Sequence, residues 1–144
     1  MKSNITILAV VAAAILGYSF WPVGQKTSVI DHVKSAEGTP LADVILPKNL
    51  SQNAQIGKLG FEAKCAACHG KNAAGNDGIA PPLGNRIYEP SHHADESFQR
   101  AVALGVPAHH WRFGNMPTIE SLTTGDVTMI TAYIRELQRA NGIN

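Results

Sequence analysis

The chain has 144 residues, of which 44% are hydrophobic and 6% aromatic, and its formal net charge is +1. This length suits one small domain. The near balance of charge argues against a nucleic-acid-binding protein, which would show a basic excess or a basic stripe.

The first feature in chain order is an apolar N-terminal run. Lys2 precedes an uncharged stretch from Ile5 to Trp21, and Pro22 ends it. A basic start before an apolar core predicts an export segment over residues 1–22. The run is slightly shorter than the ~20 residues that span a bilayer, but its terminal aromatic residues suit a membrane interface. We favour an uncleaved membrane anchor over a removed signal peptide. Either places the domain in the periplasm or on the periplasmic side of the cytoplasmic membrane.

A tether is predicted over residues 23–52, where glycine and proline are scattered among polar residues. We expect it to lie partly on the domain through Val44, Ile45 and Leu46. The compact domain is predicted over residues 53–144. That is small for a hydrophobic core, so a bound apolar group would stabilise it.

A helix is predicted over residues 53–66, and a long loop rich in glycine and proline from Lys71 to Asn85. The helix carries apolar Ile56, Leu59, Phe61 and Ala63.

Between these two segments lies Cys65-Ala66-Ala67-Cys68-His69, the Cys-x-x-Cys-His attachment signature of c-type haem. Each thiol can form a thioether with a haem vinyl group, and the histidine is carried beneath the porphyrin, where a ring nitrogen can bind iron. Both cysteines of the chain are used here, so none remains for a structural disulfide. A zinc site would need a second Cys/His pair, and a redox dithiol would normally follow a strand in a βαβ unit. The motif therefore predicts one covalent haem c with its iron.

Two more helices are predicted towards the C-terminus. A short one covers residues 97–104 and stops at Gly105. The last one starts at a cap from Thr123 or Thr124 and ends at Asn141. Its apolar residues recur at three- and four-residue steps: Val127, Ile130, Ile134 and Leu137. No segment reads convincingly as a strand, so the fold class is all-α.

Several separated positions resemble class I mono-haem cytochromes c of bacterial type. Gly57, Phe61 and Cys65 repeat the small–aromatic–cysteine spacing of that family's N-terminal helix. Ala132-Tyr133-Ile134 resembles the aromatic segment of the C-terminal helix that crosses it. The resemblance implies an all-α cytochrome c fold, preceded here by the apolar N-terminal helix, in which the two terminal helices cross around one covalent haem. A small residue is needed at such a crossing, and Gly57 supplies it.

The same resemblance suggests the surroundings of the haem. Pro81 stands where the family has a proline whose carbonyl accepts from the ring N–H of the haem histidine, here His69. Leu83 is expected to pack near the porphyrin. Met116, followed by proline, matches the second axial ligand, a soft thioether that suits iron(II) and raises the reduction potential. Met129, inside the last helix, is expected in the core.

Residues around the ligand loop leave alternatives open. The pairs His92–His93 and His109–His110 can bind the haem iron, hold a separate copper or zinc ion, or face solvent. Trp111 and Arg112 are both donors, so we predict that they hold a haem propionate. The alternative puts Trp111 in the core and Arg112 in solvent.

These features favour a monomeric one-electron carrier, and not an enzyme, that exchanges electrons with exported or membrane-bound redox protein partners. Lys58, Lys64 and Lys71 near the attachment helix can steer an acidic partner, or form an ordinary solvated face. The alternatives are a haem enzyme or gas sensor with an open iron position, and a protein that handles metal or haem through its histidine pairs.

Overall fold

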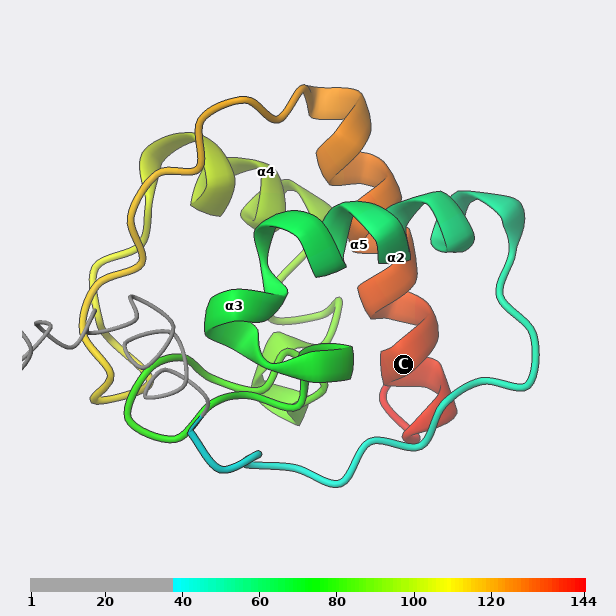
Figure 1. The fold of residues 1–144 in the computed structure, drawn as a ribbon, viewed down its shortest axis with the longest axis horizontal. Helices are drawn as coiled ribbons and strands as arrows, with labels where there is room; N and C mark the ends of the chain where they lie inside the picture. The colour runs from blue at the N-terminus through cyan, green and yellow to red at the C-terminus, as the bar shows by residue number, and fades with distance from the viewer. Residues whose placement is uncertain (1–37) are drawn as a thin grey trace, which may run out of the picture.

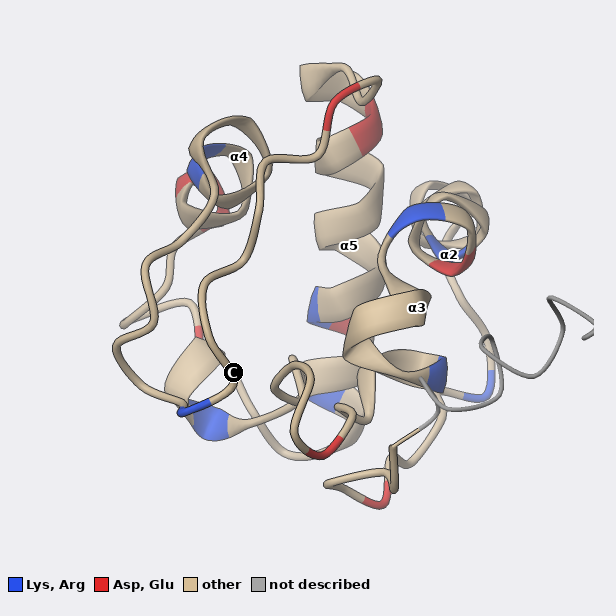
Figure 2. Cartoon of the chain, turned by 60° about the vertical axis from the view of Figure 1, so that its left-hand side comes forward, with Lys and Arg blue, Asp and Glu red and all other residues tan. Residues whose placement is uncertain are grey.

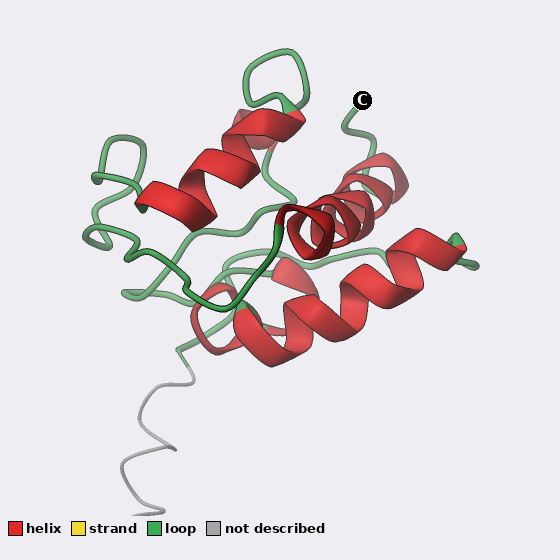
Figure 3. Cartoon of the chain, turned by 90° about the horizontal axis from the view of Figure 1, so that it is seen from above, coloured by secondary structure: helices red, strands yellow, loops and turns green. Residues whose placement is uncertain are grey.

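The computed structural model describes residues 38–144 (Figure 1). The elements in order are α2 (Gln52–Lys64), α3 (Ala66–His69), η3 (Lys71–Ala73), η4 (Arg86–Tyr88), α4 (Asp95–Leu104) and α5 (Thr124–Ala140). Within this range no strand forms, and only two isolated bridges join extended residues (Figure 3). The all-α prediction is confirmed for the described part. The predicted N-terminal apolar helix lies outside it.

Among residues 38–144, no helix is both long enough and apolar enough to cross a membrane.

Helix α2 turns a narrow face of mostly small residues to the core. Ser51 caps its N-terminus by accepting the Ala54 N–H at 3.2 Å. The buried residues of the helix are Ala54, Gly57 and Phe61. Three of the four apolar residues that predicted this helix lie off that face: Ile56 is 52% exposed, Leu59 is 68% exposed, and Ala63 is also exposed. Close packing against α5 selects the small residues instead.

The crossing of α2 and α5 depends on Gly57, as predicted. A Cβ atom at this position would lie 1.8 Å from the carbonyl oxygen of Met129 and 2.3 Å from its carbonyl carbon. No side chain can fit at that distance, because the obstacle is backbone rather than a movable side chain. The glycine therefore allows the two helix backbones to touch.

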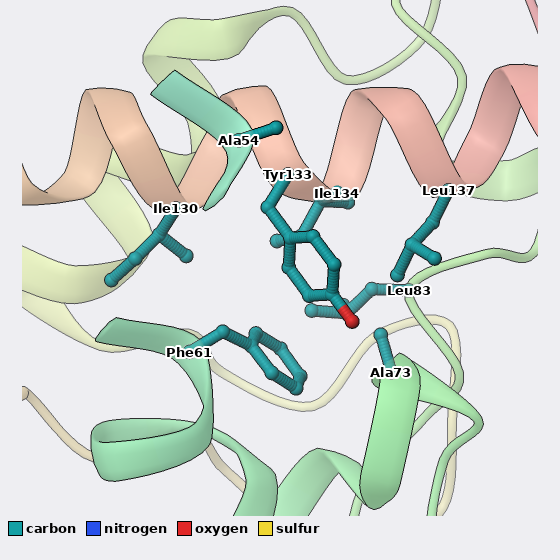
Figure 4. Packing of buried hydrophobic residues seen from close by; sticks show 8 residues of the cluster. All are labelled: Ala54, Phe61, Ala73, Leu83, Ile130, Tyr133, Ile134 and Leu137. Atoms are coloured by element: carbon teal, nitrogen blue, oxygen red, sulfur yellow. The ribbon is translucent and has the colours of Figure 1, made fainter. Parts of the chain in front are cut away.

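Buried side chains fill the space beside this crossing (Figure 4). Phe61 of α2 and Tyr133 of α5 point towards each other, with ring centroids 5.6 Å apart and planes tilted by 58°. This arrangement is favourable for aromatic pairs. The cluster is completed by Ile130, Ile134 and Leu137 of α5, together with Ala54 of α2, Ala73 of η3 and Leu83. The core predicted from the spacing along α5 is confirmed.

Local signals also define the ends of α5. Thr123 accepts the Asp126 N–H at 3.2 Å, and Asp126 accepts the Thr123 N–H at 2.8 Å, which forms a capping box. Of the two threonines proposed as the cap, Thr123 is the one used. The helix ends at Asn141, as expected, and the side chain of Asn141 exchanges two hydrogen bonds with the backbone of Ile45, each 2.9 Å long.

Those two bonds belong to a longer contact between residues 39–51 and the domain. The N–H groups of Leu41 and Ala42 both donate to the Ala74 carbonyl at 3.0 Å. Val44 packs against the buried cluster, as expected. The side chains of Ile45 and Leu46 are 66% and 53% exposed. This part of the predicted tether is thus held mainly by its backbone, and it runs under the domain towards α2 in Figure 1.

Candidate haem site

A cavity of about 500 Å³ opens between α3, α4, α5 and the loops that follow α3 and α4. Seven of the eight side chains predicted from the sequence to surround a haem line it: Cys65, Cys68, His69, Pro81, Leu83, Trp111 and Met116. Arg112, the eighth, is exposed and does not belong to the lining.

One wall is the attachment motif on the short helix α3, with Cys65 at its N-cap. His69 ends this helix and is buried. Its Nδ1 lies 2.9 Å from the carbonyl oxygen of Pro81, the contact expected from the resemblance. A carbonyl only accepts, so Nδ1 carries the proton and Nε2 keeps its lone pair for a metal. Burial lowers the pKa of His69, partly offset by this bond, and so favours the neutral ring that a metal binds.

The two thiols sit differently in this wall. Cys65 is half-buried and Cys68 is exposed. Burial, and secondly the neighbouring Cys68, raises the pKa of Cys65 to about 11. Until it is alkylated, Cys65 in the folded chain is therefore a protonated thiol and a weak nucleophile.

Met116 lines the cavity from the loop between α4 and α5. Its N–H donates to the Val106 carbonyl and its carbonyl accepts the Val106 N–H, both at 2.9 Å. Just before this bridge, Gly105 has a φ of +71°, and a Cβ there would lie 2.6 Å from the Met116 oxygen. These contacts fix the backbone of Met116, which carries the thioether. Met129 is half-buried on α5, outside both the cavity lining and the buried cluster, which corrects the expectation that it is a core residue.

The cavity wall also contains a buried hydrogen-bond donor, the indole nitrogen of Trp111. Trp111 stacks on Phe113 with ring centroids 5.6 Å apart, and its buried Nε1 makes no well-formed hydrogen bond to the described residues. Burial raises the pKa of Tyr88 to about 12, against the opposing effect of its interaction with Trp111, and so keeps this phenol protonated. The Trp111 indole N–H and the Tyr88 hydroxyl are both donors in the cavity wall, which suits a bound carboxylate. The apolar walls, the free His69 nitrogen and these donors together fit a haem with its propionates.

Comparison with protein families gives a match to the cytochrome c model over residues 54–138, which is more than half of the chain. The chain belongs to the cytochrome c family. It follows that it carries a covalently bound haem c with iron and belongs to a family that generally acts in electron transfer. Comparison with curated proteins and with solved structures gives no match.

The cytochrome brings together four histidines that the sequence left without a role. His93, His109 and His110 line the cavity, and His92 packs against two of them. Desolvation, and then the three neighbouring histidines, lower the pKa of His110. The rings therefore form one group at the cavity rim rather than two independent surface pairs.

Sequence reasoning missed the polar pair that supports this rim. Arg135 and Gln138 of α5 are 7% and 1% exposed. Arg135 donates to the carbonyls of Tyr88 and His93, to the Gln138 Oε1 and to Asp95. Gln138 donates in turn to the carbonyls of Leu83 and Tyr88. The available signal was their position beside Ile134 and Leu137 on the apolar face of an amphipathic helix.

Proposed function

We propose that this cytochrome is a one-electron carrier whose haem is bonded to Cys65 and Cys68 and whose iron is ligated by His69 and Met116. The observation that carries the proposal is that an oriented imidazole and a methionine with a hydrogen-bonded backbone line the same cavity from different parts of the chain. Bound haem supplies a reversible one-electron couple at iron, with a potential raised by thioether ligation.

The chain's own part in this function is to hold the ligands still. The Pro81 carbonyl keeps the His69 ring in one tautomer and orientation. The Val106 bridge keeps the Met116 backbone in place through oxidation and reduction. If His69 and Met116 both bind the iron, they would leave no position open for a substrate at the metal. A haem enzyme or gas sensor would require Met116 to leave the metal.

We assign a role to the two donors in the cavity wall, Trp111 and Tyr88. Trp111 Nε1 and the Tyr88 hydroxyl are proposed to donate to a haem propionate, since both side chains line the cavity and the Trp111 Nε1 is buried. Arg112 is exposed and would reach a propionate only at the cavity mouth. Replacing Trp111 with phenylalanine should alter the pH dependence of the reduction potential without loss of haem. An unchanged potential–pH curve would remove Trp111 from this role.

Partners are proposed to be redox proteins that dock transiently at the exposed edge of the haem site, as electron-transfer encounters do. Of the three lysines considered, Lys58 pairs with Glu62 at 2.8 Å and Lys64 donates to Ser121 at 3.2 Å, while Lys71 is exposed. Basic and acidic residues are interspersed along the described chain (Figure 2), and α2, α4 and α5 each carry both signs. We therefore propose that any steering by these lysines is modest.

The decisive experiment is the optical spectrum of the haem-loaded protein, oxidised and reduced, with and without CO. The expected result is a weak far-red sulfur-to-iron band when oxidised, and no change on adding CO when reduced. Met116→Ala should abolish the band and lower the potential. Met129→Leu is the matched control and should change neither. A high-spin wild-type spectrum that shifts with CO would reject the carrier and favour an enzyme or sensor.

We also propose that the N-terminal segment exports this cytochrome to the periplasmic side of the membrane, because covalent haem attachment and the apolar run both suit that destination. Fractionation of expressing cells tests this proposal. Haem staining in the membrane fraction after alkaline washing would support an anchor, and staining in the soluble periplasmic fraction a cleaved signal. Accumulation of haem-free chain in the cytoplasm would contradict export.

A further inference from the structure

Three histidines from two distant loops converge at the cavity rim. His92 and His93 precede α4, and His110 lies in the loop after it. One ring nitrogen of each lies within 4.8 Å of the others. The centroids of these three rings are 4.7 to 5.5 Å apart, with planes inclined by 52° to 77°. The three rings are therefore close enough for one nitrogen of each to reach a common ion.

Hydrogen bonds to backbone groups hold both loops in this arrangement. The Glu89 carbonyl accepts the N–H groups of His92 at 3.0 Å and His93 at 2.7 Å, which closes a tight turn. The buried Arg135 holds the same turn by donating to the His93 carbonyl. In the other loop, Asn115 Oδ1 accepts the Ala108 N–H at 2.8 Å. The backbone that carries the histidines is thus held by hydrogen bonds in both loops. The three side chains are brought together by this backbone and not only by contacts between their rings.

The His93 ring already has the tautomer that a metal ligand needs. His93 Nδ1 lies 2.6 Å from the Ile87 carbonyl oxygen, so it carries the proton and leaves Nε2 unprotonated. A carbonyl on the far nitrogen is the usual support of a metal-binding histidine. His92 and His110 contact the other histidine rings and remain exposed, so they can turn onto an ion.

The required movement is small. A zinc–nitrogen bond of about 2.0–2.1 Å puts two ligand nitrogens of a tetrahedral site about 3.3 Å apart. The three nitrogens here need to approach by roughly an ångström and a half at most. Rotation of exposed side chains supplies that without moving the backbone.

We propose that His92, His93 and His110 form a second metal site, separate from the haem iron, that binds one divalent transition-metal ion and prefers copper(II). Imidazole nitrogen suits copper and zinc, and copper(II) binds nitrogen ligands most tightly among the divalent first-row ions. The group contains no carboxylate, so calcium and magnesium, which need oxygen ligands, are poor candidates. Three protein ligands leave a fourth position for water.

The site lies at the rim of the haem cavity, since His93 and His110 also line that cavity. A divalent cation there adds positive charge near the haem and disfavours its oxidised, more positive form. Occupancy therefore raises the reduction potential of the haem. This proposal does not require Met116 to be the axial ligand, so the two can fail independently.

The test uses the full-length, haem-loaded protein without a histidine tag, stripped with a chelator and then titrated with copper(II) or zinc(II) chloride by calorimetry. The expected stoichiometry is one ion per haem. Copper should give an electron paramagnetic resonance spectrum with nitrogen hyperfine structure and should raise the haem potential, while the axial-ligand bands of the haem stay unchanged.

Single variants His92→Asn, His93→Asn and His110→Asn should each weaken copper binding at least about tenfold. His109→Asn is the matched control, because His109 neighbours His110 on the same loop yet lies outside the group of three. It should change the affinity less than about threefold. Haem absorbance in each variant verifies the fold.

Three results would overturn the proposal. One is a wild-type protein that binds no ion beyond its iron. Another is a triple variant that retains the binding, which would place it elsewhere on the chain. The last is a copper-induced change of the axial-ligand bands, which would mean that these histidines act at the haem iron itself.

Discussion

Replacement of Arg135 with alanine tests the polar support of the haem cavity. The guanidinium makes its hydrogen bonds inside the protein, with the side chain 8% exposed. Its ion pair with Asp95, 2.8 Å long, accounts for only a small part of the stability that Arg135 contributes. The Asp95 side chain is 67% exposed, and such pairs contribute about 0–1 kcal/mol. The Tyr88 carbonyl also keeps a donor after the substitution, because Gln138 Nε2 bonds it at 3.0 Å.

Most of the expected loss of stability comes from two hydrogen-bond acceptors that would be left without their arginine donor. The His93 carbonyl and the Gln138 Oε1 would each lose their arginine donor, at a cost of about 1–3 kcal/mol apiece. Arg135 also lies 5.0 Å from the centroid of the Phe98 ring, a contact contributing about 0.5–2 kcal/mol. Because neighbouring contributions are not additive, we expect the free energy of unfolding to fall by about 3–5 kcal/mol, within the sum of these separate losses.

Denaturant titration of the haem-loaded protein, followed by helix circular dichroism and haem absorbance, measures this change. Arg135→Lys should lose less, because it keeps the charge but not the planar fork of donors. Arg139→Ala on the same helix is the matched control. Its side chain is 56% exposed and lies 3.9 Å from Glu136, so the change should stay within about 0.5 kcal/mol. A loss under about 1 kcal/mol for Arg135→Ala, or one equal to the control, would refute this reasoning.

Three further outcomes are expected. Gly57→Ala should destabilise the protein by several times the effect of alanine at exposed Leu59, as measured by denaturant titration, because its Cβ would meet the α5 backbone; equal effects would contradict the crossing. Gly105→Ala should weaken or abolish the far-red band assigned to Met116 while leaving the haem attached, since the new Cβ would lie 2.6 Å from the Met116 oxygen; an unaltered band would show that the loop adapts. Thr123→Ala should cost about 1 kcal/mol at neutral pH. Hydrogen bonds from Thr123 lower the pKa of Asp126, so their stabilisation is present above the ordinary carboxyl pKa and is lost as the pH falls through the lowered value. The difference between Thr123→Ala and wild type should therefore shrink in acid, and a constant difference would argue against the capping box.

Local chemistry made much of this cytochrome predictable. The attachment motif needs residues within one turn of helix, so its spacing alone indicated the haem. The threonine cap and the apolar spacing of α5 likewise depend on neighbours three or four residues away, and both predictions were confirmed. The resemblance to cytochromes c added contacts between distant residues, and two of them are present: the Gly57 crossing and the bond from His69 to Pro81.

The sequence by itself therefore determined the haem chemistry, the helical class and the terminal helices. Only the tertiary structure decided which α2 residues face the core, because the shape of α5 selects small side chains and leaves Ile56 and Leu59 exposed. It also decided that Arg135 is satisfied although buried, since its acceptors come from segments about forty residues away. The convergence of His92, His93 and His110 arises in the same way. Two loops carry them, and the distance between these loops depends on how the helices pack. The spacing of residues along the sequence does not predict that packing.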